Sequence, residues 1–348
     1  MNPFLTEIFQ QPKAVRDTTA YHQSHAGQRV LHDIKNLWDS GICTKLIFTG
    51  MGSSYFISEA AACLFNSYGM DACAINSGEL LHYRSALIVP GTLLICVSQS
   101  GESYEVVRLL EKVGSDVKVI AVTNEPDSTL AKRADHVVIS VAGKEEMTST
   151  KTFITSWQNI LVLFRTLVNE SWSVDVWEKV AVDIETILAS CDDWMENALE
   201  SLGSASFIQL VGRGPSFAAV SQSRLMFMEA SHTPASALLG GEFRHGPLEM
   251  VGEGFVAILF AHSRSKTYAL MTGLADDLIS YGAKVIFVTD ADMVSSDRMC
   301  VINVPCEEEH MFVIQSVIPI QLLIDEWSCR KGMIPGDFTH GHKVTCRE

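Results

Sequence analysis

The sequence predicts an α/β protein of two similar domains, each a parallel β-sheet between two layers of helices. Short apolar segments alternate with helical segments along the whole chain, as they do in proteins with parallel sheets. A strand followed by a glycine-containing turn and a helix occurs at 46–60 and again at 207–225, so we expect two copies of one unit. The length of 348 residues is also typical of about two domains.

In the first half of the chain, helix is expected up to about residue 40, and five strands are expected after it. Each strand is a short run of mostly apolar residues, which is typical of strands covered on both faces. The segments between them carry apolar residues at roughly helical spacing. The expected strands are 44–49, 72–76, 93–97, 118–123 and 136–141, with helices at 58–68 and 105–113.

In the second half, a helical stretch from about 153 to 202 is expected to lead into another set of strands. These are 207–211, 255–260, 284–289 and 299–304, with helices at 218–231 and 311–330. The expected division of the chain is a helical segment at 1–40, a first domain at 41–170, a helical linker at 171–200, a second domain at 201–334 and a tail at 335–348.

The composition argues against nucleic-acid and membrane partners. The chain has 26 Lys+Arg against 41 Asp+Glu, whereas nucleic-acid backbones are bound by clustered basic residues. No apolar run reaches the roughly 18 residues of a membrane span, and no signal peptide is visible. The nine cysteines form no CxxC pair, which is typical of buried, reduced thiols and gives no support for zinc. We therefore expect a cytoplasmic protein without a metal site.

Residues 98–103 (Ser-Gln-Ser-Gly-Glu-Ser), here called the serine loop, carry the strongest functional signal. They lie between an expected strand and an expected helix, where backbone N–H groups favour an anion. Three hydroxyls and an amide add donors without charge, which suits a phosphate monoester on a small, otherwise neutral ligand. The alternative is that the serines only cap the helix, but one residue is enough for a cap. The pattern GxxxxGK[ST] is absent, so nucleotide hydrolysis is not indicated.

Two other segments offer hydroxyl groups next to expected helices. Residues 50–54 (Gly-Met-Gly-Ser-Ser), here called the glycine turn, follow the first strand, and residues 148–152 (Thr-Ser-Thr-Lys-Thr) precede a helix. Ligands of open α/β sheets bind beyond the carboxyl ends of the strands, so the glycine turn and the serine loop can converge on one ligand. The alternatives are a simple tight turn and a hydroxyl N-cap.

The second half holds the candidates for proton transfer. Residues 240–247, here called the HGP loop, place Glu242 and His245 between turn glycines and a proline. His245 is therefore a candidate proton donor or acceptor. Glu229 is flanked by apolar residues on an expected helix, and it is either an exposed helix residue or a desolvated base.

The tail contains His340, His342 and Lys343. No carboxylate or cysteine pattern accompanies the two histidines, so we interpret the tail as a polar terminus and not as a metal site.

Together these motifs resemble the sugar isomerase (SIS) family, in particular the isomerase half of glucosamine-6-phosphate synthase and its stand-alone relatives. The resemblance runs from about residue 25 to the end. The serine loop is similar to the family's SQSG[ED][ST] phosphate loop, and TSTKTF to its ASTKAF segment. GRG at 212–214 and GGEFRHGPLEM are similar to motifs of its second domain. The resemblance implies two SIS domains of the flavodoxin-like, three-layer αβα kind.

The resemblance also implies roles for single residues. Glu229 precedes the HGP histidine by 16 residues, as the family's isomerisation base does, and His245 matches the histidine that assists ring opening. The position of the ring-opening lysine is matched by Lys343 or His342, depending on the alignment. The implied phosphate- and substrate-binding residues are Gly52, Ser53, Ser54, Ser98, Gln99, Ser100, Ser103, Ser149, Arg213 and Glu242.

The chain departs from the synthase in two ways. Met226 stands where the synthase has a lysine, three residues before the base. No glutaminase half is present in the sequence, so synthesis from glutamine is not expected.

The function that fits these departures is the release of an amine from an amine-linked hexose 6-phosphate. We therefore expect a deglycase of the fructoselysine- or glucoselysine-6-phosphate type. The alternatives are an isomerising glucosamine-6-phosphate deaminase, an aldose–ketose phosphate isomerase and a non-catalytic sugar-phosphate sensor. The substrate's own carbonyl or imine accepts electrons, so no cofactor is expected. The expected partners are a small sugar phosphate and a second copy of the chain, in a homodimer with a shared active site or in a larger oligomer.

Overall fold

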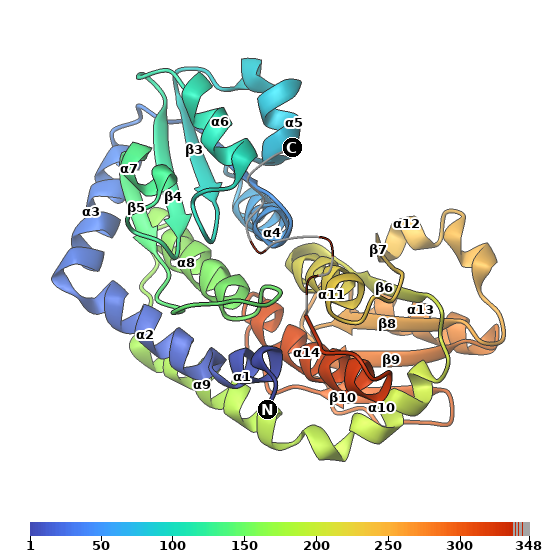
Figure 1. Cartoon of the computed structure of the whole chain (residues 1–348). Coiled ribbons are helices and arrows are strands. Elements are labelled where there is room, and N and C mark those ends of the chain that lie inside the picture. The colour runs from blue at the N-terminus through green and yellow to red at the C-terminus, as the bar shows by residue number, and fades with distance from the viewer. Residues whose placement is uncertain (337, 339, 341–342, 344–348) are drawn as a thin grey trace. The chain divides into compact units, whose positions relative to one another are not determined.

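The computed structural model describes residues 1–336, 338, 340 and 343. The chain divides into two compact units. The N-terminal unit comprises Gln10–Ala181 together with the tail residues His340 and Lys343. The C-terminal unit comprises Met1–Phe9 and the described residues from Val182 up to residue 338. Each unit is built on one β-sheet with helices on its faces (Figure 1).

The sheet of the N-terminal unit has the strand order β2-β1-β3-β4-β5, and its paired strands are parallel. The strands are β1 Lys45–Gly50, β2 Ala72–Asn76, β3 Thr92–Val97, β4 Lys118–Thr123 and β5 His136–Ile139. Every residue of β3 is buried, as is nearly every residue of β1 and β4, which explains their continuous apolar sequences. The five strands predicted for this half are confirmed.

Helices cover both faces of this sheet. α8 (Lys151–Leu167) packs against α2 (Gln11–Gln23), α3 (His25–Asp39) and α4 (Ser53–Ser67). α6 (Tyr104–Lys112) packs against α5 (Ser77–His82) and α7 (Thr129–Arg133), and the short helix η1 (Ser85–Leu87) follows α5. The result is a three-layer α/β unit, as predicted.

The C-terminal unit repeats this arrangement. Its parallel sheet has the order β10-β9-β8-β6-β7, which is the order of the first sheet when the strands are numbered within the unit. The strands are β6 Ile208–Gly212, β7 Ala235–Leu239, β8 Val256–Ala261, β9 Lys284–Thr289 and β10 Met299–Asn303. The prediction of two copies of one unit is therefore confirmed at the level of topology.

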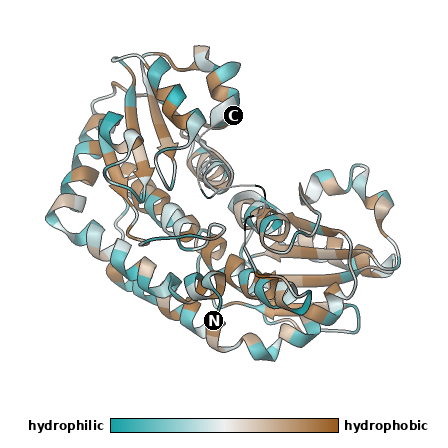
Figure 2. Cartoon of the chain, viewed as in Figure 1, coloured by the Kyte–Doolittle hydropathy of each residue, from teal (hydrophilic) through white to brown (hydrophobic). Residues whose placement is uncertain are grey.

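The helices of the C-terminal unit connect and flank these strands. α11 packs against α14, and α13 packs against β8 and β9. The bounds are α1 Pro3–Phe9, α10 Met195–Leu202, η3 Gly214–Ser216, α11 Phe217–Ala230, α12 Gly240–Phe243, η4 Pro247–Met250, α13 Tyr268–Ser280 and α14 Phe312–Arg330. The strands are predominantly hydrophobic in both units (Figure 2).

Three expectations need correction. The first 40 residues form three helices, and the second break comes at Ser24, which is extended and whose hydroxyl accepts a bond from Gly27 N–H. The stretch from 153 to 202 is also divided, into α8, α9 (Val174–Ala189), η2 (Cys191–Asp193) and α10. Strand β7 was not predicted, because it is an edge strand whose residues are only partly buried and begin with Ala-Ser-Ala.

In the described part of the chain, eight cysteines are free thiols. Cys63 and Cys329 are exposed, which corrects the expectation that the thiols are buried. No helix among the described residues combines the length and the apolarity needed to cross a membrane.

A buried histidine in the N-terminal unit makes stability depend on pH. The ring of His22 is buried, and its Nε2 lies 2.7 Å from Oδ1 of Asn159. Burial lowers the pKa of His22 from 6.5 to about 4, against a smaller opposing effect of the Asn159 hydrogen bond. Because the folded pKa is below the unfolded one, the unfolded state binds more protons as the pH falls from 6.5 to 4. The free energy of unfolding should therefore fall by about 3 kcal/mol over this window because of His22.

Urea unfolding at pH 7 and pH 4 of the wild type and of His22→Asn measures this effect. The wild type should lose about 3 kcal/mol more than the variant between the two pH values. An equal loss in both proteins would show that His22 does not titrate as its burial requires.

Candidate active site

The N-terminal unit brings the glycine turn and the serine loop to the same edge of its sheet. β1 lies between β2 and β3, and the chain leaves β1 for β2 on one side and then returns to β3 on the other. Such a switch in strand order opens a crevice at the carboxyl ends of the two strands. The glycine turn follows β1 and the serine loop follows β3, so both lie at this crevice.

The serine loop is held by its own hydrogen bonds and by the neighbouring strand. Ser98 Oγ accepts a bond from Gly101 N–H (3.2 Å) and lies 3.3 Å from Ser103 Oγ. The carbonyl of Gln99 accepts a bond from Asn124 N–H, just after β4. The loop is therefore shaped before any ligand binds.

Both helices that begin at the crevice lack a side-chain cap among the described residues. α4 starts after Gly52, which has no side chain, and α6 starts after Ser103, whose hydroxyl accepts no capping bond. The interpretation of Ser103 as an ordinary cap is therefore wrong. At α4, the N–H groups of Ser54 and Tyr55 already bond to the carbonyls of Met51 and Gly52. The start of α6 and the serine hydroxyls are therefore the main candidate donors for a phosphate group.

The glycine turn must be narrow because β1, β3 and α4 meet there. A Cβ on Gly50 would lie 2.8 Å from the carbonyl oxygen of Val97 and 2.8 Å from Cβ of Ser54. Ser53 and Ser54 in the first turn of α4 are half-buried beside this contact. The close approach places them next to the end of β3, where the serine loop starts.

Gly101 gives the serine loop a conformation that other residues adopt at a cost. Its φ is +63°, and a Cβ there would lie 2.1 Å from Ser128 Oγ, the N-cap hydroxyl of α7. Gly101→Ala should lower the free energy of unfolding by about 2–3 kcal/mol and weaken sugar-phosphate binding.

Gly143→Ala is the matched control for Gly101→Ala. Gly143 has a similar φ of +69° but open space around its missing Cβ, so only the conformational cost of about 1 kcal/mol should appear. Urea unfolding and calorimetric titration with glucose 6-phosphate measure both effects. Equal behaviour of the two variants would contradict this account of the loop.

A cavity of about 540 Å³ adjoins the crevice. It is lined by residues of the glycine turn, α5 and the first turn of α6, among them Met51, Asn76 and the buried Glu105.

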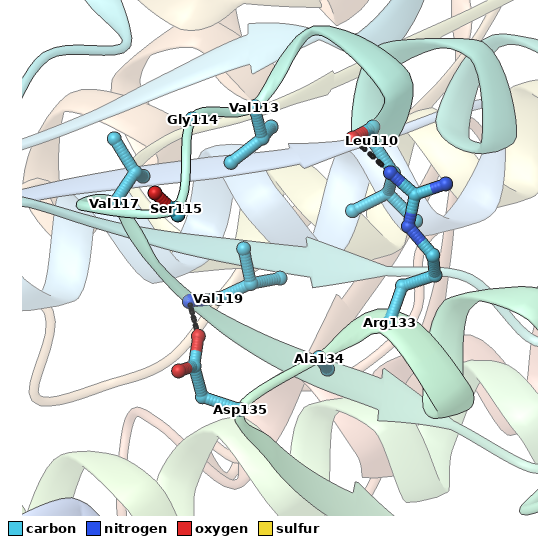
Figure 3. A pocket seen from close by; sticks show the side chains of 9 residues that line it. All are labelled: Leu110, Val113, Gly114, Ser115, Val117, Val119, Arg133, Ala134 and Asp135. Atoms are coloured by element: carbon cyan, nitrogen blue, oxygen red, sulfur yellow. Dashed lines mark hydrogen bonds between the residues drawn. The ribbon is translucent and has the colours of Figure 1, made fainter.

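Another cavity, of about 230 Å³, lies at the opposite edge of the sheet, between the ends of α6 and α7 and the start of β4 (Figure 3). There Arg133 donates to the Leu110 carbonyl and Asp135 accepts from Val119 N–H, so its polar groups serve the fold.

Ser149 lies in a segment organised by a buried carboxylate. The Oγ of Ser149 is 2.9 Å from Oγ1 of Thr152, which donates to Oε2 of Glu145 (2.5 Å). Thr150, the N-cap of α8, makes no side-chain capping bond. Sequence reasoning missed Glu145, because Gly-Lys-Glu-Glu at 143–146 is typical of an exposed charged loop.

Of the two tail candidates, Lys343 is described and His342 lies outside the described residues. The Nζ of Lys343 donates to Oε2 of Glu145 and to the carbonyl of Met147, each at 2.6 Å. Burial alone would raise the pKa of Glu145, but Lys343 and the bonds from Thr152 outweigh it and hold the pKa below its usual range. The tail lysine is thus an ion-pair partner of the segment that contains Ser149.

The C-terminal unit groups Arg213 with the HGP loop. The Arg213 side chain packs against Gly240 and Gly241. Phe243 is buried and anchors the loop, while Glu242 and His245 are exposed. Glu229, near the end of α11, is half-buried, and Met226 one turn earlier is fully buried.

The second sheet has an equivalent switch point, between β6 and β8, but there both donors of Ser263 are engaged by a carboxylate. The carboxylate of Asp290 accepts bonds from the N–H and the hydroxyl of Ser263, directly after the buried His262. A carboxylate at this position disfavours a second anion. The described residues therefore favour the first sheet over the second as the place for an anion.

The SIS domain model matches residues 43–167 and 201–324, one stretch in each unit. The chain belongs to the SIS domain family and contains two such domains. The predicted resemblance to this family is confirmed.

The relatives extend this finding. The chain is 28% identical over 343 residues to the glutamine–fructose-6-phosphate aminotransferase [isomerizing] of Clostridium acetobutylicum, covering 94% of this chain and 56% of that relative. It therefore spans about half the length of that protein.

Two solved structures share the fold over nearly their whole length. Tagatose-6-phosphate ketose/aldose isomerase from Escherichia coli has a TM-score of 0.82 at 22% identity, over 98% of this chain and 97% of its own. Glucosamine-6-phosphate deaminase from Thermotoga maritima has a TM-score of 0.77 at 20% identity, over 99% of each chain. These similarities confirm the predicted three-layer fold.

Proposed function

We propose that the chain is a deglycase that releases an amine from an amine-linked hexose 6-phosphate. The observation that carries the proposal is the uncapped start of α6 beside the serine loop at the switch point of the first sheet. A phosphate bound there is fixed by neutral donors and by the helix N-terminus. The sugar carbons are left to other groups for chemistry.

Glu229 and His245 are the proposed acid–base pair. In a 1-amino ketose, Glu229 removes a proton from C1 of the opened sugar, and the C1–H electron pair forms the C1–C2 double bond. The π pair of the C2 carbonyl moves to its oxygen, which takes a proton, and the product is an enaminol. Protonation at C2 then gives an imine at C1. Water adds to this imine, and the C1–N bond breaks to release the amine and an aldose 6-phosphate. His245 moves the proton of the ring oxygen or protonates the leaving amine.

An isomerising glucosamine-6-phosphate deaminase is the second candidate. The reverse proton transfer, from C2 to C1, would place the imine at C2, and hydrolysis would give ammonia and a ketose 6-phosphate. Its support is the likeness to the deaminase fold from Thermotoga maritima. The support for the deglycase over this candidate is the resemblance of GGEFRHGPLEM to the deglycase form of the motif, which also lacks the synthase lysine replaced here by Met226.

Amine release from three substrates separates these candidates. Fructoselysine 6-phosphate, glucoselysine 6-phosphate and glucosamine 6-phosphate are each incubated with the protein, and free lysine or ammonia is measured. The deglycase proposal predicts lysine from one of the first two and little ammonia from the third. Ammonia from glucosamine 6-phosphate alone would establish the deaminase instead.

We also propose that the chain acts as a homodimer in which His245 serves the partner's site. The support is the exposure of His245 on its loop within a single chain, together with the implied family arrangement.

A further inference from the structure

The carboxylate of Glu145 is a fully buried charge with an unusually complete set of partners. It accepts hydrogen bonds from the N–H and the hydroxyl of Thr150, from the N–H and the hydroxyl of Thr152, and from Nζ of Lys343. Its side chain has an exposed fraction of 0%. A buried charge is tolerated only where such partners compensate its lost hydration. Glu145 therefore determines the shape of the segment that precedes α8.

The amine of Lys343 is largely occupied at this position. An ammonium group has three N–H donors, and here one bonds to Glu145 and another to the Met147 carbonyl. One donor is left for another group. The two bonds have the geometry of an ammonium in an ion pair with Glu145, and an ammonium has no lone pair with which to attack a carbonyl carbon.

A continuous chain of hydrogen bonds runs from the tail to the sugar-contacting candidate. Lys343 bonds to Glu145, Glu145 to Thr152 Oγ1, and Thr152 Oγ1 lies 2.9 Å from Ser149 Oγ. The positions of Lys343 and Ser149 are thus coupled through one carboxylate.

We propose that Glu145 is a positioning residue that seats Lys343 as an ammonium beside the Ser149 segment. Lys343 then presents one N–H donor and a positive charge to the bound sugar phosphate and forms no Schiff base with it. The role toward the substrate rests on the proposed function, whereas the seating of Lys343 does not.

Trypsin cleavage after Lys343 tests the seating without any substrate. Trypsin must take the lysine side chain into its own specificity pocket, so a seated Lys343 protects the bond that follows it. In the full-length protein, Glu145→Gln should raise the rate of this cleavage at least about tenfold, because the amide no longer attracts the ammonium. The matched control is Glu146→Gln, which changes the neighbouring exposed carboxylate and should leave the rate unchanged. Equal rates in wild type and Glu145→Gln would overturn the proposal.

Acetylation of the wild type covers the case in which Glu145→Gln does not fold. The side chain of Lys343 is 22% exposed and that of Lys13 is 74% exposed. With limiting acetic anhydride, native Lys343 should react at least about tenfold more slowly than Lys13, and the difference should vanish in urea. Equal acetylation rates of Lys343 and Lys13 in the native protein would contradict the proposal that Glu145 holds Lys343 in place.

Two further readouts test the role in turnover. Glu145→Gln and Lys343→Met should each lower kcat at least about tenfold, with little change in KM. The kcat of the double variant should not be lower than that of the less active single variant. Borohydride reduction during turnover should give no sugar adduct on Lys343 of the wild type. An adduct at Lys343, or additive losses, would contradict the positioning role. If no substrate is turned over, the protease and acetylation results still decide the seating.

Discussion

Replacing Glu229 by glutamine should lower the rate of amine release about 10²- to 10⁴-fold, which is the usual contribution of a general base. Glutamine has the shape of glutamate but cannot accept the proton from the sugar carbon. Under the proposed function, Glu229 transfers a proton and the serine loop binds the phosphate, so the affinity for glucose 6-phosphate should not change. The turnover number and calorimetric titration of the folded variant measure the two quantities.

The control for Glu229→Gln is Glu200→Gln, which removes an exposed carboxylate of the same unit outside the site motifs and should keep full activity. Full turnover by Glu229→Gln would show that another group is the base. Loss of sugar-phosphate binding together with turnover would show that Glu229 holds the substrate and does not transfer the proton.

The Glu229→Gln variant also tests whether two copies of the chain share one active site. His245→Asn should also lose most of its activity, and mixing it with Glu229→Gln should restore part of it. In a mixed dimer, one site can combine an intact Glu229 with the partner's intact His245. No recovery in a mixture shown to contain mixed dimers would contradict the assignment of His245 to the partner's site.

Removing the phosphate from the substrate should lower kcat/KM about 10³-fold or more. Hydrogen bonds to a charged group contribute about 1.5–3 kcal/mol each, and the crevice offers several donors. Binding energy from a remote phosphate orients the reacting carbons, so it appears in the rate as well as in the affinity. The comparison is fructoselysine 6-phosphate with fructoselysine.

Serine variants show whether the serine loop supplies this discrimination. Ser98→Ala combined with Ser103→Ala should lower kcat/KM for the phosphorylated substrate and leave the unphosphorylated one nearly unchanged. Equal kcat/KM for both substrates in the wild type would mean that the crevice does not bind the phosphate.

Most of the fold could be predicted because buried parallel strands have distinctive sequences. β4 and β9 were predicted with their observed bounds, since each is a short apolar run that the structure buries almost completely. β7 could not be predicted from its Ala-Ser-Ala-Leu-Leu sequence. It is an edge strand whose residues are only partly buried, so it lacks the continuous apolar run of a central strand. The break at Ser24 was missed because apolar residues continue at helical spacing on both sides of it.

The candidate site was predictable where a local motif carries the chemistry. The serine loop and the glycine turn follow strands in the sequence, and the strand order then brings them to one crevice. Glu145 was not predictable, because its importance comes from Lys343, which is 198 residues away along the chain. Only folding makes that carboxylate a buried partner of the tail.

The most direct test of the central claim is amine release in D₂O, with mass spectrometry of the hexose phosphate formed. Wild-type protein acting on fructoselysine 6-phosphate or glucoselysine 6-phosphate should give one equivalent of lysine and a hexose 6-phosphate with solvent deuterium on the carbon that Glu229 protonates. Tight binding of glucose 6-phosphate, with no amine released from any amine-linked hexose 6-phosphate, would contradict the account and indicate an isomerase or a sugar-phosphate sensor.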